Sequence, residues 1–242
     1  MSEIEQRPHG LVKVGGTILN YKCTRAAANF FFTDEDRSAL GVVAISAGVA
    51  GLSGQAIAVA SSSSAEEDAD YVEFDLNDKP VKGWVWRSPF REGDQVEVAA
   101  EWQCSHYEAA GIARPEDRMI ALYPHCSRGR ARHVKNALKW WFVGVSLWLL
   151  GFLLSMFLTT KLEKYLSSVA EGFPYVALGS YVFFGVMTVS MTRKWMVFVR
   201  LAEKVFRTLG LPDPSNIDLV KSSKAQRKLD DPGEFGTFYF RY

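Results

Sequence analysis

The sequence predicts an α+β membrane protein: a small antiparallel β-barrel-like domain, similar to OB or SH3-like barrels, joined to a two-helix transmembrane hairpin. Residues 140–160 and 172–192 are two runs of 21 residues without a formal charge. A helix rises about 1.5 Å per residue, so each run can cross a hydrocarbon core of roughly 30 Å. Upstream of them, short β-favouring segments alternate with turn residues, as in a compact β-domain.

The average composition conceals this division. The net charge is +1 at pH 7, and the mean hydropathy is −0.03, because an apolar half and a polar half offset each other. A nearly neutral chain gives no reason to expect a nucleic-acid partner. The opening residues lack a cationic stretch followed by an apolar one, so we expect no cleaved signal peptide. Three cysteines are odd in number and sparse, which argues against a disulfide scaffold and favours a reducing compartment.

The β-domain is expected at residues 71–125, where alternating apolar residues are separated by turn signals at 77–80 and 91–94. A domain of this size is marginal alone. We therefore expect residues 1–37 to supply its N-terminal strands, with β-favouring residues from position 11 onward.

Between these two parts, residues 38–65 form an uncharged segment rich in alanine and glycine. Its small residues recur at the spacing that lets membrane helices approach closely, and they are a predicted helix-packing or partner-binding face, which could also join copies of the chain into a homo-oligomer: Gly41, Ala44, Ala47, Gly48, Gly51 and Gly54. The segment could be one spanning helix or two short helices broken at residues 51–54. A single crossing would place residues 1–37 and 71–125 on opposite sides of the membrane, which is incompatible with one shared β-domain.

Positive charges flank the hairpin on its outer ends. They precede the first span in the stretch 128–139 and follow the second at Arg193 and Lys194, whereas the charges between the spans sum to zero. The positive-inside rule then places the β-domain and the C-terminus in the cytoplasm. Trp140, Trp141, Arg193 and Lys194 are predicted to lie at the membrane interface.

Residues 193–211 have apolar positions at helical spacing, which predicts an amphipathic helix that ends at Gly210 and Pro212. The tail, 212–242, ends in the aromatic sequence FGTFYFRY. Because several aromatic residues rarely remain loose in water, we expect this end to dock on the rest of the protein.

No catalytic, cofactor-binding or metal-binding constellation is predicted, and the chain is not expected to be an enzyme. Two cysteines and two histidines could come together at the ends of neighbouring strands: Cys104, His106, His125 and Cys126. Their spacing departs from that of structural zinc sites, so buried thiols and surface imidazoles are the favoured interpretation. The acidic residues of 66–70 are interpreted as a solvated loop rather than a cation site.

Three stretches together resemble a bacterial family: Phe30-Phe31-Phe32 before the Ala/Gly-rich segment, GWVWRSPFREGDQVEVAAEW, and GIARPEDRMIALYPHCSRGR before two spans. Proteins with this arrangement are membrane proteins associated with type VI secretion, often described as secretion-system effectors. The resemblance covers roughly residues 10–195 and implies a place in a toxin–immunity system of the bacterial inner membrane.

Two strongly apolar spans would hinder delivery of a secreted effector, whereas an immunity protein is made in place and needs no catalytic residues. We therefore expect an immunity protein that neutralises a membrane-active toxin by direct binding, with the lipid bilayer and a cognate toxin or secretion component as partners. A pore-forming effector is the first alternative. A membrane-anchored β-domain that scaffolds other proteins is the second, because one fold can host many roles.

Overall fold

The computed structural model describes residues 10–28, residue 30 and residues 67–242. These residues fall into two compact units. The first combines the described part of Met1–Gly129 with Phe198–Tyr242, and the second is Arg130–Val197. The predicted packing face of residues 41–54 and the rest of the Ala/Gly-rich segment lie outside the described residues.

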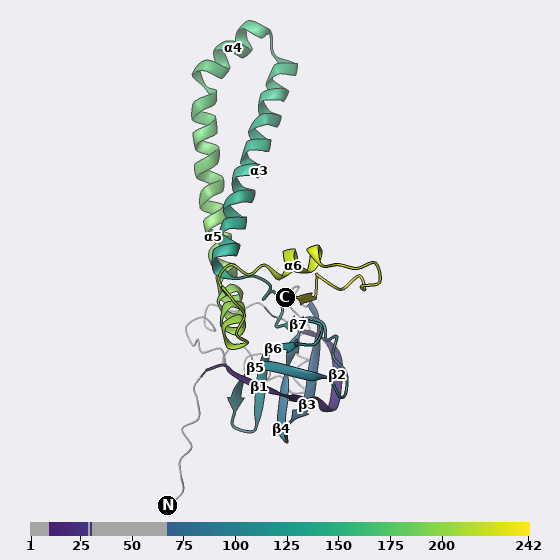
Figure 1. Cartoon of the computed structure of the whole chain (residues 1–242). Coiled ribbons are helices and arrows are strands. Elements are labelled where there is room, and N and C mark those ends of the chain that lie inside the picture. The colour runs from purple at the N-terminus through teal and green to yellow at the C-terminus, as the bar shows by residue number, and fades with distance from the viewer. Residues whose placement is uncertain (1–9, 29, 31–66) are drawn as a thin grey trace, which may run out of the picture. The chain divides into compact units, whose positions relative to one another are not determined.

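The first unit contains an eight-stranded mixed sheet (Figure 1). Its strands are β1 (Val12–Thr17), β2 (Leu19–Ala28), β3 (Glu67–Leu76), β4 (Lys79–Val85), β5 (Gln95–Gln103), β6 (His106–Arg114), β7 (Met119–Leu122) and β8 (Tyr239–Arg241). Their order is β1-β5-β6-β4-β3-β2, with β7 beside β6 and β8 beside β7.

The sheet differs from the predicted antiparallel barrel in two respects. The β5–β6 hairpin places β6 beside β4 in the same direction, so this one pair among the described strands is parallel. Hydrogen bonds do not close the sheet, because β1 pairs with β5 and β2 pairs with β3, but β1 and β2 do not pair with each other. The architecture is therefore a mixed sheet with helices, and barrel closure is not established.

Ile18 is the single residue between β1 and β2, and it is fully buried. Its amide donates to the Asp94 carbonyl at 2.9 Å, and its carbonyl accepts from the Gly93 amide at 2.9 Å. These bonds hold the chain where it passes from one edge of the strand order to the other. As a result, residues on both sides of the Ala/Gly-rich segment belong to one sheet, with Ala28 opposite Glu67.

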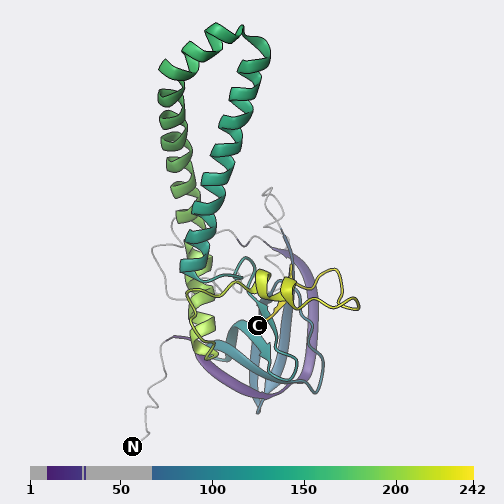
Figure 2. The same ribbon diagram turned by 45° about the horizontal axis from the view of Figure 1, so that its top comes forward.

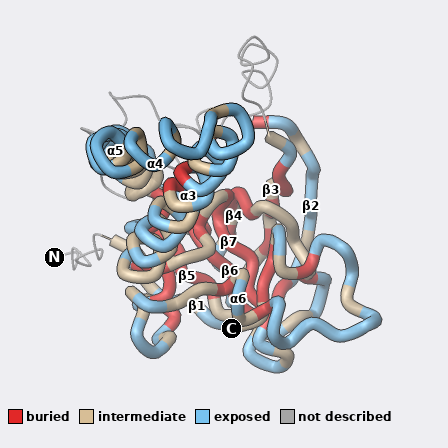
Figure 3. Tube along the Cα trace, turned by 90° about the horizontal axis from the view of Figure 1, so that it is seen from above, coloured by how far each residue is buried: buried red, intermediate tan, exposed pale blue. Residues whose placement is uncertain are grey.

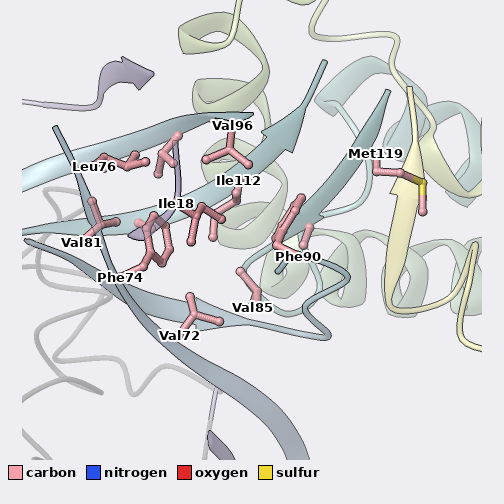
Figure 4. Close-up of a cluster of buried hydrophobic side chains, with 14 of the residues drawn as sticks. Ile18, Val72, Phe74, Leu76, Val81, Val85, Phe90, Val96, Ile112 and Met119 are labelled. Atoms are coloured by element: carbon pink, nitrogen blue, oxygen red, sulfur yellow. The ribbon is translucent and has the colours of Figure 1, made fainter. Parts of the chain in front are cut away.

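One face of the sheet carries the hydrophobic core shown in Figure 4. Val72, Phe74 and Leu76 alternate along β3 and point to the same side, as the two-residue period of a strand requires. Val81 and Val85 extend this cluster onto β4. The alternation of apolar and polar residues in the sequence of β3 is thus explained by the burial of one face of the sheet.

The C-terminal tail docks on this unit. Tyr239–Arg241 forms β8 against β7, and Phe235 and Phe240 are each 1% exposed. The short helix α6 (Leu219–Ala225) precedes this strand, and its Ser223 hydroxyl accepts from the Arg241 amide at 2.8 Å. The aromatic residues at the end of the chain are therefore part of the folded core.

The second unit is a helical hairpin of α3 (Arg130–Thr159), α4 (Leu162–Glu171) and the first part of α5 (Phe173–Thr208). Both α3 and α5 are long and apolar enough to cross a membrane. Most of their side chains in this unit are exposed, whereas strands β4 to β7 are largely buried (Figure 3). The stretch between the two uncharged runs forms α4, which has an amphipathic sequence.

The predicted amphipathic helix at 193–211 is not a separate element. It is the last part of α5, which continues from the second apolar run because no glycine or proline interrupts residues 186–208. Its apolar face, including Phe198, Ala202 and Phe206, is buried in the first unit. The helix ends before Gly210, whose positive φ of 78° suits glycine at a helix C-terminus.

The close approach of β4 and β6 gives a test of the sheet. A Cβ added at Gly83 would lie 2.5 Å from the Ala109 carbonyl oxygen, whereas one at Gly15 would meet its nearest atom at 3.7 Å. We expect Gly83→Ala to lower the free energy of unfolding by about 1–3 kcal/mol, because the neighbouring backbone must move. Denaturant unfolding of the full chain measures this, with Gly15→Ala as the matched control within about 0.5 kcal/mol of the parent. Equal stabilities would contradict the β4–β6 pairing.

Candidate functional site

The hairpin contains a groove between its two long helices, which run side by side in both ribbon views (Figures 1 and 2). The cavity measures about 620 Å³, within the range of small-molecule sites. From α3 it is lined by His133, Ala137, Trp140, Trp141, Gly144, Val145 and Trp148. From α5 it is lined by Phe184, Met187, Thr188, Met191, Thr192 and Trp195. The lining is predominantly apolar, with four tryptophans.

Tyr181 organises one end of this helix pair. Its hydroxyl lies 2.8 Å from the Ser146 hydroxyl, and its ring packs on Trp141 and Phe142 at centroid distances of 5.5 and 5.9 Å. Gly185 lies against α3 at this point, since a Cβ added to it would be in ordinary van der Waals contact with the Trp141 indole at 3.6 Å. These contacts hold the helices together beside the groove without filling it.

Trp141 also carries a polar group, which lies close to Gly185 of α5. Its indole Nε1 is buried and has no hydrogen-bond partner in the described part of the chain. An unpaired buried N–H carries a free-energy penalty of about 1–3 kcal/mol. By contrast, the Thr188 hydroxyl in the same lining already donates to the Phe184 carbonyl at 2.8 Å.

Positively charged residues lie on the same two helices without lining the groove. Lys139 adjoins it in sequence, and its Nζ lies 5.8 Å from the centroid of the Trp140 ring, which lines the groove. Arg193 and Lys194 lie between the lining residues Thr192 and Trp195 on α5. The stretches 130–159 and 173–197 contain no aspartate or glutamate.

The structure brings only two of the sequence-predicted interface residues to the groove. Trp140 and Trp141 line it, whereas Arg193 and Lys194 lie on α5 outside the lining. Sequence reasoning missed the groove itself. Ala137, Trp141, Gly144 and Trp148 recur at spacings of four, three and four residues, which is the signal of one helical face that could have revealed it.

The sheet contains a second unusual group, two buried glutamates on neighbouring strands. Glu101 of β5 pairs directly with Glu108 of β6, and they are 8% and 3% exposed. Glu101 Oε1 accepts from the Gly10 amide at 3.2 Å, whereas Glu101 Oε2 and Glu108 Oε1 have no hydrogen-bond partner among the described residues. Like charges directly opposite each other on a sheet are unfavourable, so one carboxyl should be protonated.

Burial raises the pKa of Glu108 to about 8, and nearby Lys82 only partly opposes this shift. Burial also lowers the pKa of His106, with Lys82 adding to the effect. The 3.3 Å contact between His106 Nε2 and Glu108 Oε2 is therefore a neutral hydrogen bond near pH 7 rather than an ion pair.

The cysteines and histidines considered for zinc do not form one site. Cys104 is exposed, whereas the buried Cys126 thiol donates to the Phe198 carbonyl at 3.4 Å. His125 lies 3.0 Å from Glu67 and packs between Trp86 and Phe198, so it is not the surface imidazole that we expected. Among the described residues, no group of three or more His, Cys, Asp or Glu side chains could hold a metal ion.

The acidic stretch at 66–70 was also misinterpreted as a solvated loop. β3 already begins at Glu67, and Asp70 is 4% exposed. Its Oδ1 lies 3.0 Å from Arg25 Nε and 3.4 Å from Arg87 Nη1, and its Oδ2 accepts from the Ser88 amide at 3.0 Å. Asp70 therefore forms ion pairs with two arginines and accepts one backbone hydrogen bond. These contacts are structural, because they join β3 to β2 and to the segment after β4.

Comparisons with protein-family models, with curated proteins and with solved structures give no match for this chain. The arguments for its function therefore come from its own residues and geometry.

Glu108 predicts how stability depends on pH. The unfolded chain releases this proton near the usual pKa of 4.5, whereas the folded sheet retains it up to about 8. Between these values the unfolded state binds fewer protons, so the free energy of unfolding should fall as pH rises, by at most about 1.4 kcal/mol per unit. Unfolding of the full chain at pH 5 to 8 measures the slope. We expect Glu108→Gln to reduce it, and Glu116→Gln, in an exposed turn, to leave it unchanged; equal slopes would contradict a neutral Glu108.

Proposed function

We propose that the protein resides in the bacterial inner membrane, where α3 and α5 cross the bilayer and α4 lies on the outer side. The β-domain and the C-terminal tail lie in the cytoplasm. Two apolar helices of sufficient length support this placement. The orientation is supported by the cations at 128–139 and at Arg193 and Lys194, since cytoplasmic flanks are enriched in Lys and Arg.

Reporter fusions test this topology. A cytoplasmic reporter such as β-galactosidase should be active after Tyr242, and alkaline phosphatase should be active only when inserted within 161–171, because that enzyme needs the oxidising periplasm. The reciprocal fusions serve as controls in each case. Alkaline phosphatase activity after Tyr242 would reverse the orientation.

We also propose that the sheet is an OB-like barrel. Its strand order begins at β1 and ends at β2, and these two strands are joined directly at Ile18, so the chain itself connects the two edges. A partly open barrel of this kind is the general architecture of OB domains. This proposal favours a binding role for the domain over a catalytic one.

For the biological role, we propose an immunity protein that neutralises a membrane-active toxin of a type VI secretion system by direct binding. The supporting observation is the exposure of the hairpin, since α3 has only Val145 and Leu149 buried and both helices present large apolar side chains outward. A toxin acting within the bilayer would meet this surface. The sequence resemblance described above supports the type VI setting.

A second role, a membrane-anchored scaffold, is favoured by one specific observation. The sheet has its own hydrophobic core and a docked C-terminal strand, so it is a complete domain that the hairpin could simply tether. A pore-forming effector would depend on the Ala/Gly-rich segment, which lies outside the described residues.

Co-expression distinguishes these roles. Expressed alone, an immunity protein should leave growth and membrane potential unchanged, and it should restore growth when the toxin of its gene neighbourhood is produced. Depolarisation caused by this chain alone, abolished by Gly48→Leu or Gly51→Leu, would instead identify a pore-forming effector. A chain that is harmless but gives no protection would favour the scaffold.

A further inference from the structure

The short helix α4 divides its apolar and polar side chains between two faces. At about 3.6 residues per turn, its apolar side chains fall within an arc of about 140°. These side chains are Leu162, Tyr165, Leu166, Val169 and Ala170. The opposite arc holds Glu163, Lys164, Ser167, Ser168 and Glu171. Such a division is typical of a helix that lies on a membrane surface.

We propose that α4 lies on the outer surface of the bilayer, with its apolar face inserted at the boundary between headgroups and acyl chains and its polar face in water. This inference rests on the membrane location proposed above. It goes beyond the outer position that the topology requires, because it assigns the lipid surface as the partner of the apolar face.

The hairpin itself leaves the centre of this apolar face uncovered. Leu162 and Leu166 are one helical turn apart, and they are 61% and 57% exposed. The edge of the face is used for packing, since the Tyr165 ring lies 5.5 Å from the ring of Phe157 on α3. This contact joins α4 to α3 while the two leucines still face outward, so they can enter a surrounding lipid phase.

The lengths of the two apolar runs determine the depth of α4. Residues 140–160 and 172–192 are each 21 residues without a formal charge. As helices they extend about 31 Å, close to the thickness of a hydrocarbon core of roughly 30 Å. Lys139 precedes the first run and Arg193 follows the second, so both runs start from one side and reach the same depth at their other ends.

This equality of length determines how α4 lies. The helix is about 15 Å long and joins the ends of α3 and α5, as Figures 1 and 2 show. If α4 stood upright in the bilayer, one of the two runs would have to end about 15 Å deeper than the other. Two runs of equal length instead place α4 across their ends, at the level where the hydrocarbon core meets the headgroups.

The charges of this region indicate that the partner is the bilayer surface itself and not a particular anionic lipid. Lys161, Glu163, Lys164 and Glu171 sum to zero over residues 161–171. A neutral helix gains no net attraction to an anionic leaflet. Its attachment depends on apolar contact and on its covalent links to both spans, which keep it at a high effective concentration beside the lipid.

Spin labels on the full chain in phosphatidylcholine vesicles test the proposal, with Cys23→Ser and Cys104→Ser removing the two exposed cysteines. The measurement compares the accessibility of each label to oxygen, which concentrates in the bilayer, and to a water-soluble nickel chelate. We expect the oxygen-to-nickel ratio to be about fivefold higher for a label at Leu166→Cys than at Ser167→Cys, its neighbour on the polar face. Replacing the lipid by phosphatidylglycerol should change this ratio by less than about twofold.

Two further labels serve as controls. Leu162→Cys repeats the measurement one turn earlier on the same face, and it should also favour oxygen. Leu154→Cys lies within the first apolar run and is an exposed position of α3. It should give the highest ratio of the set, because it reports whether α3 crosses the bilayer, independently of α4.

Equal ratios at Leu166 and Ser167, with a high ratio at Leu154, would overturn the surface position of α4 and leave the membrane location intact. A label at Leu154 that favours the nickel chelate would overturn the membrane location itself. A label at Leu166 that neither reagent reaches, together with spin–spin broadening between chains, would also overturn the proposal, because it would assign the apolar face to a second copy.

Discussion

The cost of exposing the hairpin's apolar side chains to water is the constraint on which the rest of this structure depends. Leu147, Leu150 and Leu158 are 62%, 62% and 74% exposed, and the pattern continues along both helices. Burial of one such side chain is worth about 1.5–3 kcal/mol. The hairpin does not recover this free energy by packing on itself. A bilayer would supply it, and both α3 and α5 are long and apolar enough to cross one.

A bilayer around these helices would also explain why a groove persists between them. In water, an apolar gap of this size would favour closure, whereas in lipid there is no hydrophobic force that drives the helices together. Association then depends on specific contacts such as the Ser146–Tyr181 hydrogen bond and the packing of Trp141 at Gly185. The sheet differs from the hairpin in this respect, because it is stabilised by a hydrophobic core that is shielded from water.

The sequence revealed the features governed by local pattern and missed those governed by tertiary pairing. Uncharged runs at 140–160 and 172–192 are sufficient to identify two membrane-length helices, because length and polarity decide that property alone. The parallel β4–β6 pair and the buried Glu101–Glu108 pair depend on which strands become neighbours, and no local signal states this. Likewise, the sequence alone predicts that an aspartate or glutamate is solvated. The tertiary environment decides otherwise in two different ways: two arginines pair with Asp70, whereas burial raises the pKa of Glu108.

The sheet also constrains the membrane topology independently of charge. Because Ala28 and Glu67 are opposed in the antiparallel β2–β3 ladder, the residues before and after the Ala/Gly-rich segment lie on the same side of any membrane. The single crossing considered from the sequence is therefore incompatible with this sheet. The same reasoning applies to the hairpin, since the unit containing the sheet includes both Met1–Gly129 and Phe198–Tyr242. Residues 130–197 must return to the side from which they depart, so α3 and α5 cross together or not at all, and the basic flanks only select which side that is.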